Sequence, residues 1–229
     1  SNRRTSDKHS SWERFPLWAS LLFLGAFLLR VVLGYSSLGY TVDTDTFKSW
    51  ANLLNQVGFR EIYHQDIFLD YPPGYLYVLL FLEKLRLLLG LPAASQGYTL
   101  LLKLPSILSD LLCAGVVLKL ALPRLGERWA LLLSGAYLFC PAIYLNSSQW
   151  GQVDSFCTAI VLASVLLLDR ERFVPSAILF GVSVACKPQM LVFAPLYFFF
   201  TIRRGKWGKL LLGMVLALGT VLFIALPYT

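Results

Sequence analysis

The sequence predicts an all-α, polytopic membrane protein with seven transmembrane helices and a long first external loop that carries surface helices. Hydrophobic residues make up 57% of its 229 residues, against about 45–50% in a soluble domain, and the mean hydropathy is +0.64. Apolar runs recur along the chain with short charged clusters between them, and only helices and closed barrels satisfy their backbone in lipid. The runs do not alternate polar and apolar residues with period two, which argues against a barrel.

The first apolar segment follows a polar, basic tail at residues 1–15, which we expect on the cytoplasmic side. The segment 16–38 is long enough to cross a hydrocarbon core of about 30 Å. Arg30 lies in its second half. A cation at that depth needs an anionic partner, and a lipid phosphate or a substrate phosphate is the expected one.

The external loop, 39–99, is the longest region too polar for lipid. It opens with Asp43 and Asp45. Residues 46–58 predict an amphipathic helix, because apolar side chains recur there at i, i+3, i+4 and i+7. Asp45 is placed to cap its start and Gly58 to end it. Such a helix lies on the membrane surface rather than across the membrane.

Residues 74–91 are apolar enough for a span, but they contain Glu83, Lys84 and Arg86. If this segment does not cross, every dense basic loop falls on the cytoplasmic side with the N-terminal tail, as the positive-inside rule requires. We therefore predict a helix on the outer surface or partly inserted there. The predicted spans are then 16–38, 100–122, 128–146, 153–168, 173–187, 190–202 and 209–227.

The net charge of +7 does not indicate a nucleic-acid partner. Most Lys and Arg residues lie in short loops between apolar runs, which is the positive-inside pattern of a membrane protein, and no nucleic-acid-binding module is recognisable. The four cysteines all lie within apolar runs and lack the paired spacing of a metal site. We interpret them as small packing residues.

Asp43 and Asp45 are the first candidates for chemistry. A carboxylate held near an acceptor hydroxyl can act as a general base, and the start of a helix favours the ionised form. Asp45 alone is explained equally by helix capping, whereas capping does not account for Asp43. An Asp-x-Asp pair could also hold a divalent metal through a diphosphate, although no cofactor is indicated.

A second polar cluster joins the third and fourth predicted spans on the outer side, at residues 146–154. A tight turn explains its Asn, Ser and Gly residues, but it does not require Gln149, Gln152 and Asp154 together. We interpret these three side chains as substrate-binding. A third cluster is Lys187-Pro188-Gln189, where Lys187 is suited to a lipid phosphate, with snorkelling to headgroups as the alternative.

A fourth polar group lies within the second predicted span. Lys103, Ser106 and Asp110 occur at i, i+3 and i+7 and share one helix face. We interpret this group as a structural contact between helices. The chain contains no P-loop, no dinucleotide-binding glycine motif and no nucleophile elbow. A transferase without a nucleotide-binding domain can still work if its donor arrives in the membrane, as a polyprenyl-phosphate sugar does.

Five short motifs in order resemble the GT-C superfamily of polyprenyl-phosphate-sugar-dependent glycosyltransferases. The nearest resemblance is to the ER glucosyltransferases that extend the lipid-linked N-glycan precursor and to their prokaryotic relatives. The motifs are Asp43-Thr44-Asp45 followed by Trp50, Tyr71-Pro72-Pro73, Ser109-Asp110-Leu111-Leu112, Gln152-Val153-Asp154-Ser155, and Lys187-Pro188-Gln189-Met190 with an inserted proline.

The resemblance implies an inverting transferase of the extracytoplasmic or luminal face, in a cell membrane or the ER membrane, with Asp43 as the base. It implies a polyprenyl-phosphate-linked sugar donor and a lipid or glycan acceptor. The substrate-binding residues that we expect are Arg30, Asp45, Trp50, Tyr71, Gln149, Gln152, Asp154, Lys187 and Gln189.

Family members usually continue through further spans and another external loop, which we expect to be missing here. Two alternatives remain at this point. One is a transporter or flippase-like protein, which would show inverted repeats and broken helices. The other is a non-catalytic truncated module of such a transferase.

Overall fold

The computed structural model describes residues 3–203 and 205–229, and the side chains from Arg14 onward within these ranges. In this part of the chain all regular structure is helical. The longer helices are α1 (Arg3–Ser36), α2 (Thr41–Val57), α3 (Pro73–Leu88), α4 (Gln96–Leu125), α5 (Glu127–Leu138), α7 (Asp154–Asp169), α8 (Phe173–Cys186), α9 (Ala194–Arg203) and α10 (Trp207–Ala225). The shorter elements are η1 (Ile62–His64), α6 (Pro141–Tyr144), η2 (Leu145–Trp150), η3 (Pro188–Phe193) and η4 (Leu226–Tyr228).

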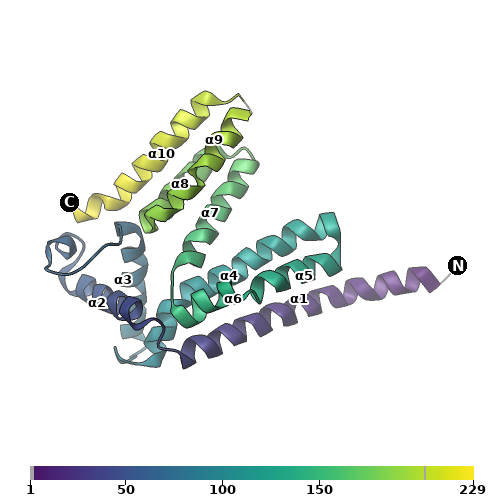
Figure 1. The fold of residues 1–229 in the computed structure, drawn as a ribbon, viewed down its shortest axis with the longest axis horizontal. Helices are drawn as coiled ribbons and strands as arrows, with labels where there is room; N and C mark the ends of the chain where they lie inside the picture. Colours follow the sequence, from purple (N-terminus) through teal and green to yellow (C-terminus); the bar gives the residue numbers. More distant parts are fainter. Residues whose placement is uncertain (1–2, 204) are drawn as a thin grey trace.

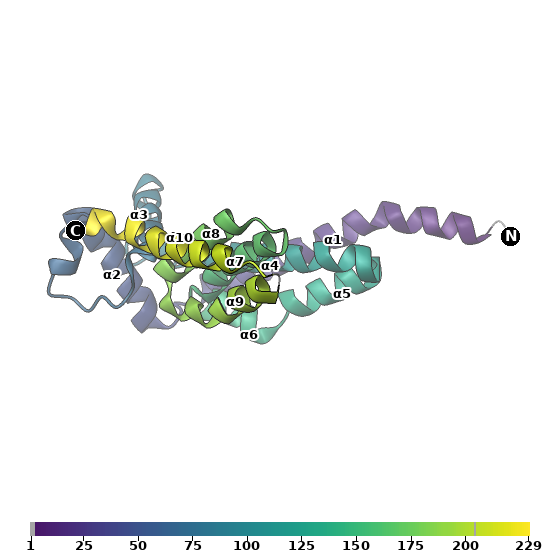
Figure 2. The ribbon, with the colours of Figure 1, turned by 90° about the horizontal axis from the view of Figure 1, so that it is seen from above.

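The helices form two groups that diverge from a common end, where α2 and α3 lie (Figure 1). One group consists of α1, α4 and α5, and the other of α7, α8, α9 and α10. Helices α4 and α7 pack against each other and join the groups. Seen from above, the molecule is elongated and the N-terminal part of α1 projects from it (Figure 2). The start of α1 and the end of η4 therefore lie at opposite ends of the bundle.

Three helices are long and apolar enough to cross a membrane, counted over the described residues: Arg14–Ser36, Gln96–Leu125 and Trp207–Tyr228. A fourth candidate is the pair Glu127–Leu138 and Pro141–Trp150, bent by 46°. The protein is thus an integral membrane protein on its helical composition. Each of the other predicted spans also contains helical residues, but these helices are short, so the count of seven crossings stays a prediction.

The tail predicted at 1–15 is helical from Arg3, as an extension of α1; residues 1 and 2 and the side chains before Arg14 lie outside the described part.

Helix α2 begins earlier than the sequence pattern predicted. It starts at Thr41 rather than residue 46, so Asp43 lies in its first turn and Asp45 lies inside the helix. The prediction that Asp45 caps the helix is therefore wrong: the N-cap position is occupied by Tyr40, which makes no side-chain capping bond. The predicted end at Gly58 is confirmed, since this residue has a φ of 80° just after the last turn.

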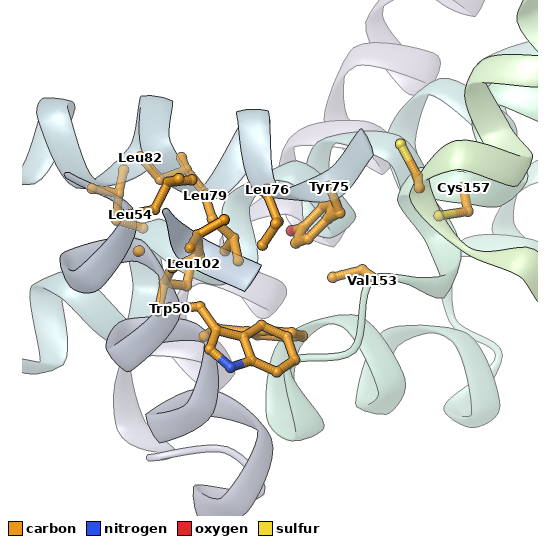
Figure 3. Packing of buried hydrophobic residues seen from close by; sticks show 14 of the residues in the cluster. Trp50, Leu54, Tyr75, Leu76, Leu79, Leu82, Leu102, Val153 and Cys157 are labelled. Atoms are coloured by element: carbon orange, nitrogen blue, oxygen red, sulfur yellow. The ribbon is translucent and has the colours of Figure 1, made fainter. Parts of the chain in front are cut away.

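The apolar face predicted for α2 is confirmed. Phe47, Trp50 and Leu54 are buried, and they pack against α3 and α4 in the main core of the protein. Figure 3 shows Trp50 and Leu54 facing Leu76 and Leu79 of α3. Val153 and Cys157 belong to the same cluster and lie beyond Tyr75. Helix α2 is therefore held by protein rather than by lipid alone, and this core positions Asp43 at its start.

Glu83 and Arg86 of α3 pair with each other within the protein, whereas Lys84 is exposed. Arg86 donates two hydrogen bonds to the carboxylate of Glu83, at 2.9 and 2.6 Å, and a third to the carbonyl of Leu91. The hydroxyl of Tyr98 donates to the same carboxylate at 2.7 Å. At 16 residues, α3 is not among the candidate spans found in the described chain. These contacts are consistent with a helix that packs under α2 rather than one that faces lipid on all sides.

The end of α10 is tied to the segment between α2 and α3. Tyr228 donates a hydrogen bond from its hydroxyl to the carbonyl of Pro73 at 3.2 Å, and Tyr77 donates to the carbonyl of Ile224 at 2.8 Å. The ring of Tyr228 also packs against those of Phe59, Tyr63 and Tyr77. The last helix therefore supports the segment that connects α2 with α3.

Candidate functional site

Asp43 accepts two hydrogen bonds from a turn more than a hundred residues later in the chain. The indole N–H of Trp150 donates to its Oδ2 at 3.1 Å, and the side-chain amide of Gln152 donates to the same oxygen. Among the described residues, Oδ1 of Asp43 accepts no hydrogen bond. The side chain is half-buried, so the protein holds one carboxylate oxygen and leaves the other without a hydrogen-bond partner in the described chain.

The turn that supplies these donors is built by close contacts between α1, α4 and η2. Ser106 of α4 donates to the carbonyl of Gln152 at 2.7 Å, and the backbone N–H of Tyr40 donates to the carbonyl of Trp150 at 2.9 Å. Gly39, with a φ of 81°, allows the approach: a Cβ there would lie 2.8 Å from the Trp150 carbonyl. The sequence folds this way locally because only glycine tolerates both the backbone angle and the contact.

A second carboxylate, Asp154, lies in the first turn of α7 on the same side of the protein. It forms an ion pair with Lys187 at the end of α8 and accepts a hydrogen bond of 3.4 Å from the amide of Asn146. The start of a helix is favourable for a negative charge. An ammonium group has three donors, and within the described chain Lys187 uses one of them on Asp154, which leaves two for an anion.

The hydroxyl of Tyr71 interacts electrostatically with both carboxylates, Asp43 and Asp154. The pKa of its hydroxyl is raised above the ordinary value, first by burial and then by the negative charges of Asp154 and, to a smaller extent, Asp43. A tyrosine in this state stays protonated and remains a hydrogen-bond donor. Its ring is held by Phe47 and Trp50, at centroid distances of 5.5 and 5.4 Å.

An open pocket of about 640 Å³ adjoins Trp150. Its wall includes Tyr40, Asn146 and Gln149, and the rings of Tyr40 and Trp150 are 5.5 Å apart. Both aromatic side chains are half exposed. Gln149 does not contact either carboxylate: its side chain is exposed on the pocket wall, and its backbone carbonyl accepts a hydrogen bond from Ser37. The pocket thus offers aromatic faces and amide groups, and Trp150, which donates to Asp43, forms part of its wall.

The structure does not bring Arg30 to this site. Arg30 is fully buried between α1, α4 and α5, where it pairs with Asp110 at 2.9 Å and donates to the carbonyls of Ala26 and Leu138. The expectation of a lipid or substrate phosphate as its partner is wrong, because Asp110 provides the charge. The predicted structural role of Asp110 is confirmed, although its partner is Arg30 rather than Lys103, which donates to the carbonyls of Gly34 and Ser37.

Three further residues expected to bind substrate form no hydrogen bond or ion pair with Asp43 or Asp154 in the described chain. Trp50 is 2% exposed, and its indole N–H donates to the carbonyl of Phe68 at 2.7 Å. Asp45 is exposed, with Lys48 at 3.8 Å. Gln189 is exposed on η3. The structure thus assigns Trp50 to the core that supports α2.

Two direct partners of the carboxylates, Trp150 and Asn146, were not among the residues predicted from the sequence. Both belong to the polar segment 146–154, whose Gln and Asp residues were predicted. The sequence does carry a signal for Trp150, which precedes Gly151 in a polar turn. A tryptophan that such a turn leaves partly exposed has its indole N–H available for a ligand or a carboxylate.

No cluster of three or more His, Cys, Asp or Glu side chains suited to a metal occurs in residues 3–203 and 205–229. The cysteines are all unpaired thiols, and three of the four are buried, in keeping with a packing role.

Residues 68–228 match glycosyltransferase family 87. The chain belongs to this family. This membership confirms, at the level of a glycosyltransferase family, the resemblance seen in the short motifs. The match includes Tyr71, Gln152, Asp154 and Lys187, but it begins after Asp43, whose role is untested by it.

The chain is also similar to a dolichyl pyrophosphate Glc1Man9GlcNAc2 alpha-1,3-glucosyltransferase of Candida glabrata, with 23% identity over 211 residues. The similarity covers 86% of this family 87 chain and 38% of the relative, so the chain spans well under half the length of that protein. No solved structure matches the chain.

Proposed function

We propose that this family 87 protein transfers a sugar, with inversion, from a polyprenyl-phosphate donor to an acceptor hydroxyl on the extracytoplasmic face. The observation that carries the proposal is the meeting of Asp43, Trp150 and Gln152 beside the Asp154–Lys187 pair. A carboxylate for proton removal and a cation for a phosphate are the two groups that such a transfer needs.

Asp43 is the proposed base. Trp150 and Gln152 hold Oδ2, so the orientation of the carboxylate is fixed before the substrate binds. The open Oδ1 takes the proton of the acceptor hydroxyl. The acceptor oxygen then attacks the anomeric carbon, the bond from that carbon to the phosphate oxygen breaks, and the lipid phosphate leaves with the electron pair. Attack opposite the leaving group inverts the anomeric centre.

Lys187 is the proposed phosphate ligand. Its side chain is largely buried, and the Asp154 carboxylate holds it in place. The N–H donors that it does not use on Asp154 can stabilise the charge that develops on the leaving phosphate. Tyr71 adds a neutral donor near both carboxylates. Arg30 takes no part in this scheme, since all three of its guanidinium nitrogens donate within the protein.

The pocket beside Trp150 is the proposed sugar site. The half-exposed faces of Tyr40 and Trp150 suit the apolar C–H faces of a sugar ring, and the amides of Asn146 and Gln149 suit its hydroxyls. The name of the Candida glabrata relative describes a glucosyltransferase of a dolichyl-linked glycan. On that similarity we propose a hexose as the transferred group and a lipid-linked glycan as the acceptor class.

The experiment is a transfer assay that offers polyprenyl-phosphate sugars to membranes containing the full-length protein. Asp43→Asn keeps the shape of the side chain but removes the base, and we expect turnover to fall by about 10²–10⁴-fold with unchanged expression. Asp45→Asn is the matched control, with an exposed carboxylate on the same helix, and should retain most activity. Turnover of Asp43→Asn close to that of the wild type would remove the assignment of the base.

A further inference from the structure

A second cavity lies at the opposite end of the second helix group from Asp43. It has a volume of about 340 Å³ and is formed by α7, α8, α9 and α10. Its wall is apolar almost throughout, and includes Phe173, Phe180, Phe198, Leu210 and Met214. In Figure 1 these four helices run side by side, and the turns that join α7 to α8 and α9 to α10 lie together at the end away from α2. The cavity is therefore separate from the carboxylate site.

The hydroxyl groups in the cavity wall already have acceptors in the protein. Ser176 donates to the carbonyl of Ser164 at 2.8 Å, Tyr197 donates to the hydroxyl of Ser164 at 2.6 Å, and Thr201 donates to the carbonyl of Tyr197 at 2.6 Å. A sugar or a chain of ordered waters would find few available donors there. Since empty apolar cavities favour apolar occupants, the cavity suits a hydrocarbon chain.

The mouth of the cavity is basic. Lys209 belongs to the wall, and its ammonium group lies 4.5 Å from the centre of the Phe173 ring. Lys206 lies 5.3 Å from the same ring and pairs with Glu171. Among the described residues, the two turns at this end contain five basic residues (Arg170, Arg172, Arg203, Lys206 and Lys209) and two acidic ones (Asp169 and Glu171). The charge at the mouth is therefore positive and complements a phosphate next to an apolar chain.

We propose that this cavity binds one acyl chain of an anionic glycerophospholipid from the cytoplasmic leaflet, with the lipid phosphate at Lys206 and Lys209. Basic pockets between membrane helices on the cytoplasmic side are suited to such headgroups. The lipid fills the space between α9 and α10 and fixes their distance from α8. The proposal does not depend on the role of Asp43, because it concerns the other end of the helix group.

Photolabelling tests the site directly. The purified protein in detergent is mixed with phosphatidylglycerol that carries a diazirine in one acyl chain, irradiated and digested. We expect label on α9 and α10, near Phe198 and Met214, and much weaker label with phosphatidylcholine that carries the same chain. Label spread evenly over the lipid-facing helices, or equal label from both lipids, would identify ordinary boundary lipid and overturn the proposal. Displacement by polyprenyl phosphate but not by phosphatidylglycerol would assign the cavity to an isoprenoid instead.

Two variants separate the contributions of chain and headgroup. Gly213→Leu places a side chain into the cavity from α10, where a Cβ meets only Ala177 at 3.8 Å, and leucine is also the better helix former. We expect it to abolish the label while the thermal transition stays at least as high as in the wild type. Lys209→Glu should lower phosphatidylglycerol labelling by about fivefold or more. The control is Lys119→Glu, an exposed lysine of α4, and labelling unchanged in both cavity variants would contradict the proposal.

Discussion

Gln152 donates a hydrogen bond to the carboxylate of Asp43 across 109 positions of the chain. The two residues come from different parts of the bundle: Asp43 from the first turn of α2, and Gln152 from the turn between η2 and α7. Trp150 of the same turn donates to the same oxygen. The orientation of Asp43 therefore depends on how η2 is held against α1 and α4, and not on its own helix alone.

Replacing Gln152 tests this dependence. A hydrogen bond to a charged group contributes about 1.5–3 kcal/mol, so we expect Gln152→Ala to lower turnover by about 10–100-fold. The Michaelis constant for the donor should change little, because the side chain orients the base rather than the lipid. Gln56→Ala is the control, because Gln56 is an exposed glutamine of α2 outside the pocket wall; a loss in turnover as large as that of Gln152→Ala would contradict the assignment.

The buried pair of Arg30 and Asp110 makes a prediction about stability. Both side chains are fully buried, and Ser147 of η2 donates to the same Asp110 oxygen at 2.6 Å. Removing one charge leaves the other uncompensated, so Asp110→Asn should destabilise the fold by about 3–5 kcal/mol. The double variant Arg30→Met, Asp110→Leu should recover much of this loss, since it removes both charges.

Thermal unfolding in detergent measures the stability of the Asp110→Asn variant and of the double variant. The surface pair of Asp45 and Lys48 is the control, and Asp45→Asn should change stability by less than about 0.5 kcal/mol. If the double variant were less stable than Asp110→Asn, the uncompensated charge would not be the cause of the loss, and the prediction would be wrong.

Gly39 makes a prediction about backbone geometry. With alanine there, the Cβ would lie 2.7 Å from Thr44 Cγ2 and 2.8 Å from the Trp150 carbonyl, in a backbone conformation that L residues rarely adopt. The backbone angle alone costs about 1–2 kcal/mol. Gly90 is a matched control, with a positive φ and open space around it. We expect Gly39→Ala to lower the unfolding temperature clearly more than Gly90→Ala does. Equal decreases would show that the backbone near residue 39 shifts to accommodate the added methyl group, and would contradict the prediction.

Glu83 makes a prediction about pH. Its pKa is lowered from 4.5, first by the hydrogen bonds from Arg86, and burial opposes this shift. A carboxyl with a lowered folded pKa stabilises the protein above its unfolded pKa, and this contribution is lost as the pH falls through the folded value. Between about pH 6 and pH 3, stability should therefore fall more in the wild type than in Glu83→Gln. Parallel pH curves of the unfolding temperature for the two proteins would contradict the prediction.

Much of the helical plan follows from apolar periodicity and charge. Apolar runs fix where α4, α8 and α10 begin and end to within a few residues, because a lipid-exposed helix must be apolar throughout. The face of α2 was predictable for the same kind of reason, since Phe47, Trp50 and Leu54 share one side. The start of α2 was not predictable, because no capping side chain marks it.

The site was predictable only in part. Asp43, Gln152, Asp154 and Lys187 were expected from their residue types in polar turns, and the structure brings them to one side of the protein. The partner of Arg30 was missed because a sequence shows that a buried cation needs a counter-charge but not which distant carboxylate supplies it. Asp110 is 80 residues from Arg30 in the chain.

The contact between Tyr228 and Pro73 has a consequence for biogenesis. The ribosome makes the connection between α2 and α3 long before it makes α10 and Tyr228, which supports that connection. The segment between α2 and α3 therefore lacks this support until α10 has been inserted. A lipid or a chaperone that shields the waiting aromatic rings of Phe59, Tyr63 and Tyr77 would then speed maturation without changing the finished protein.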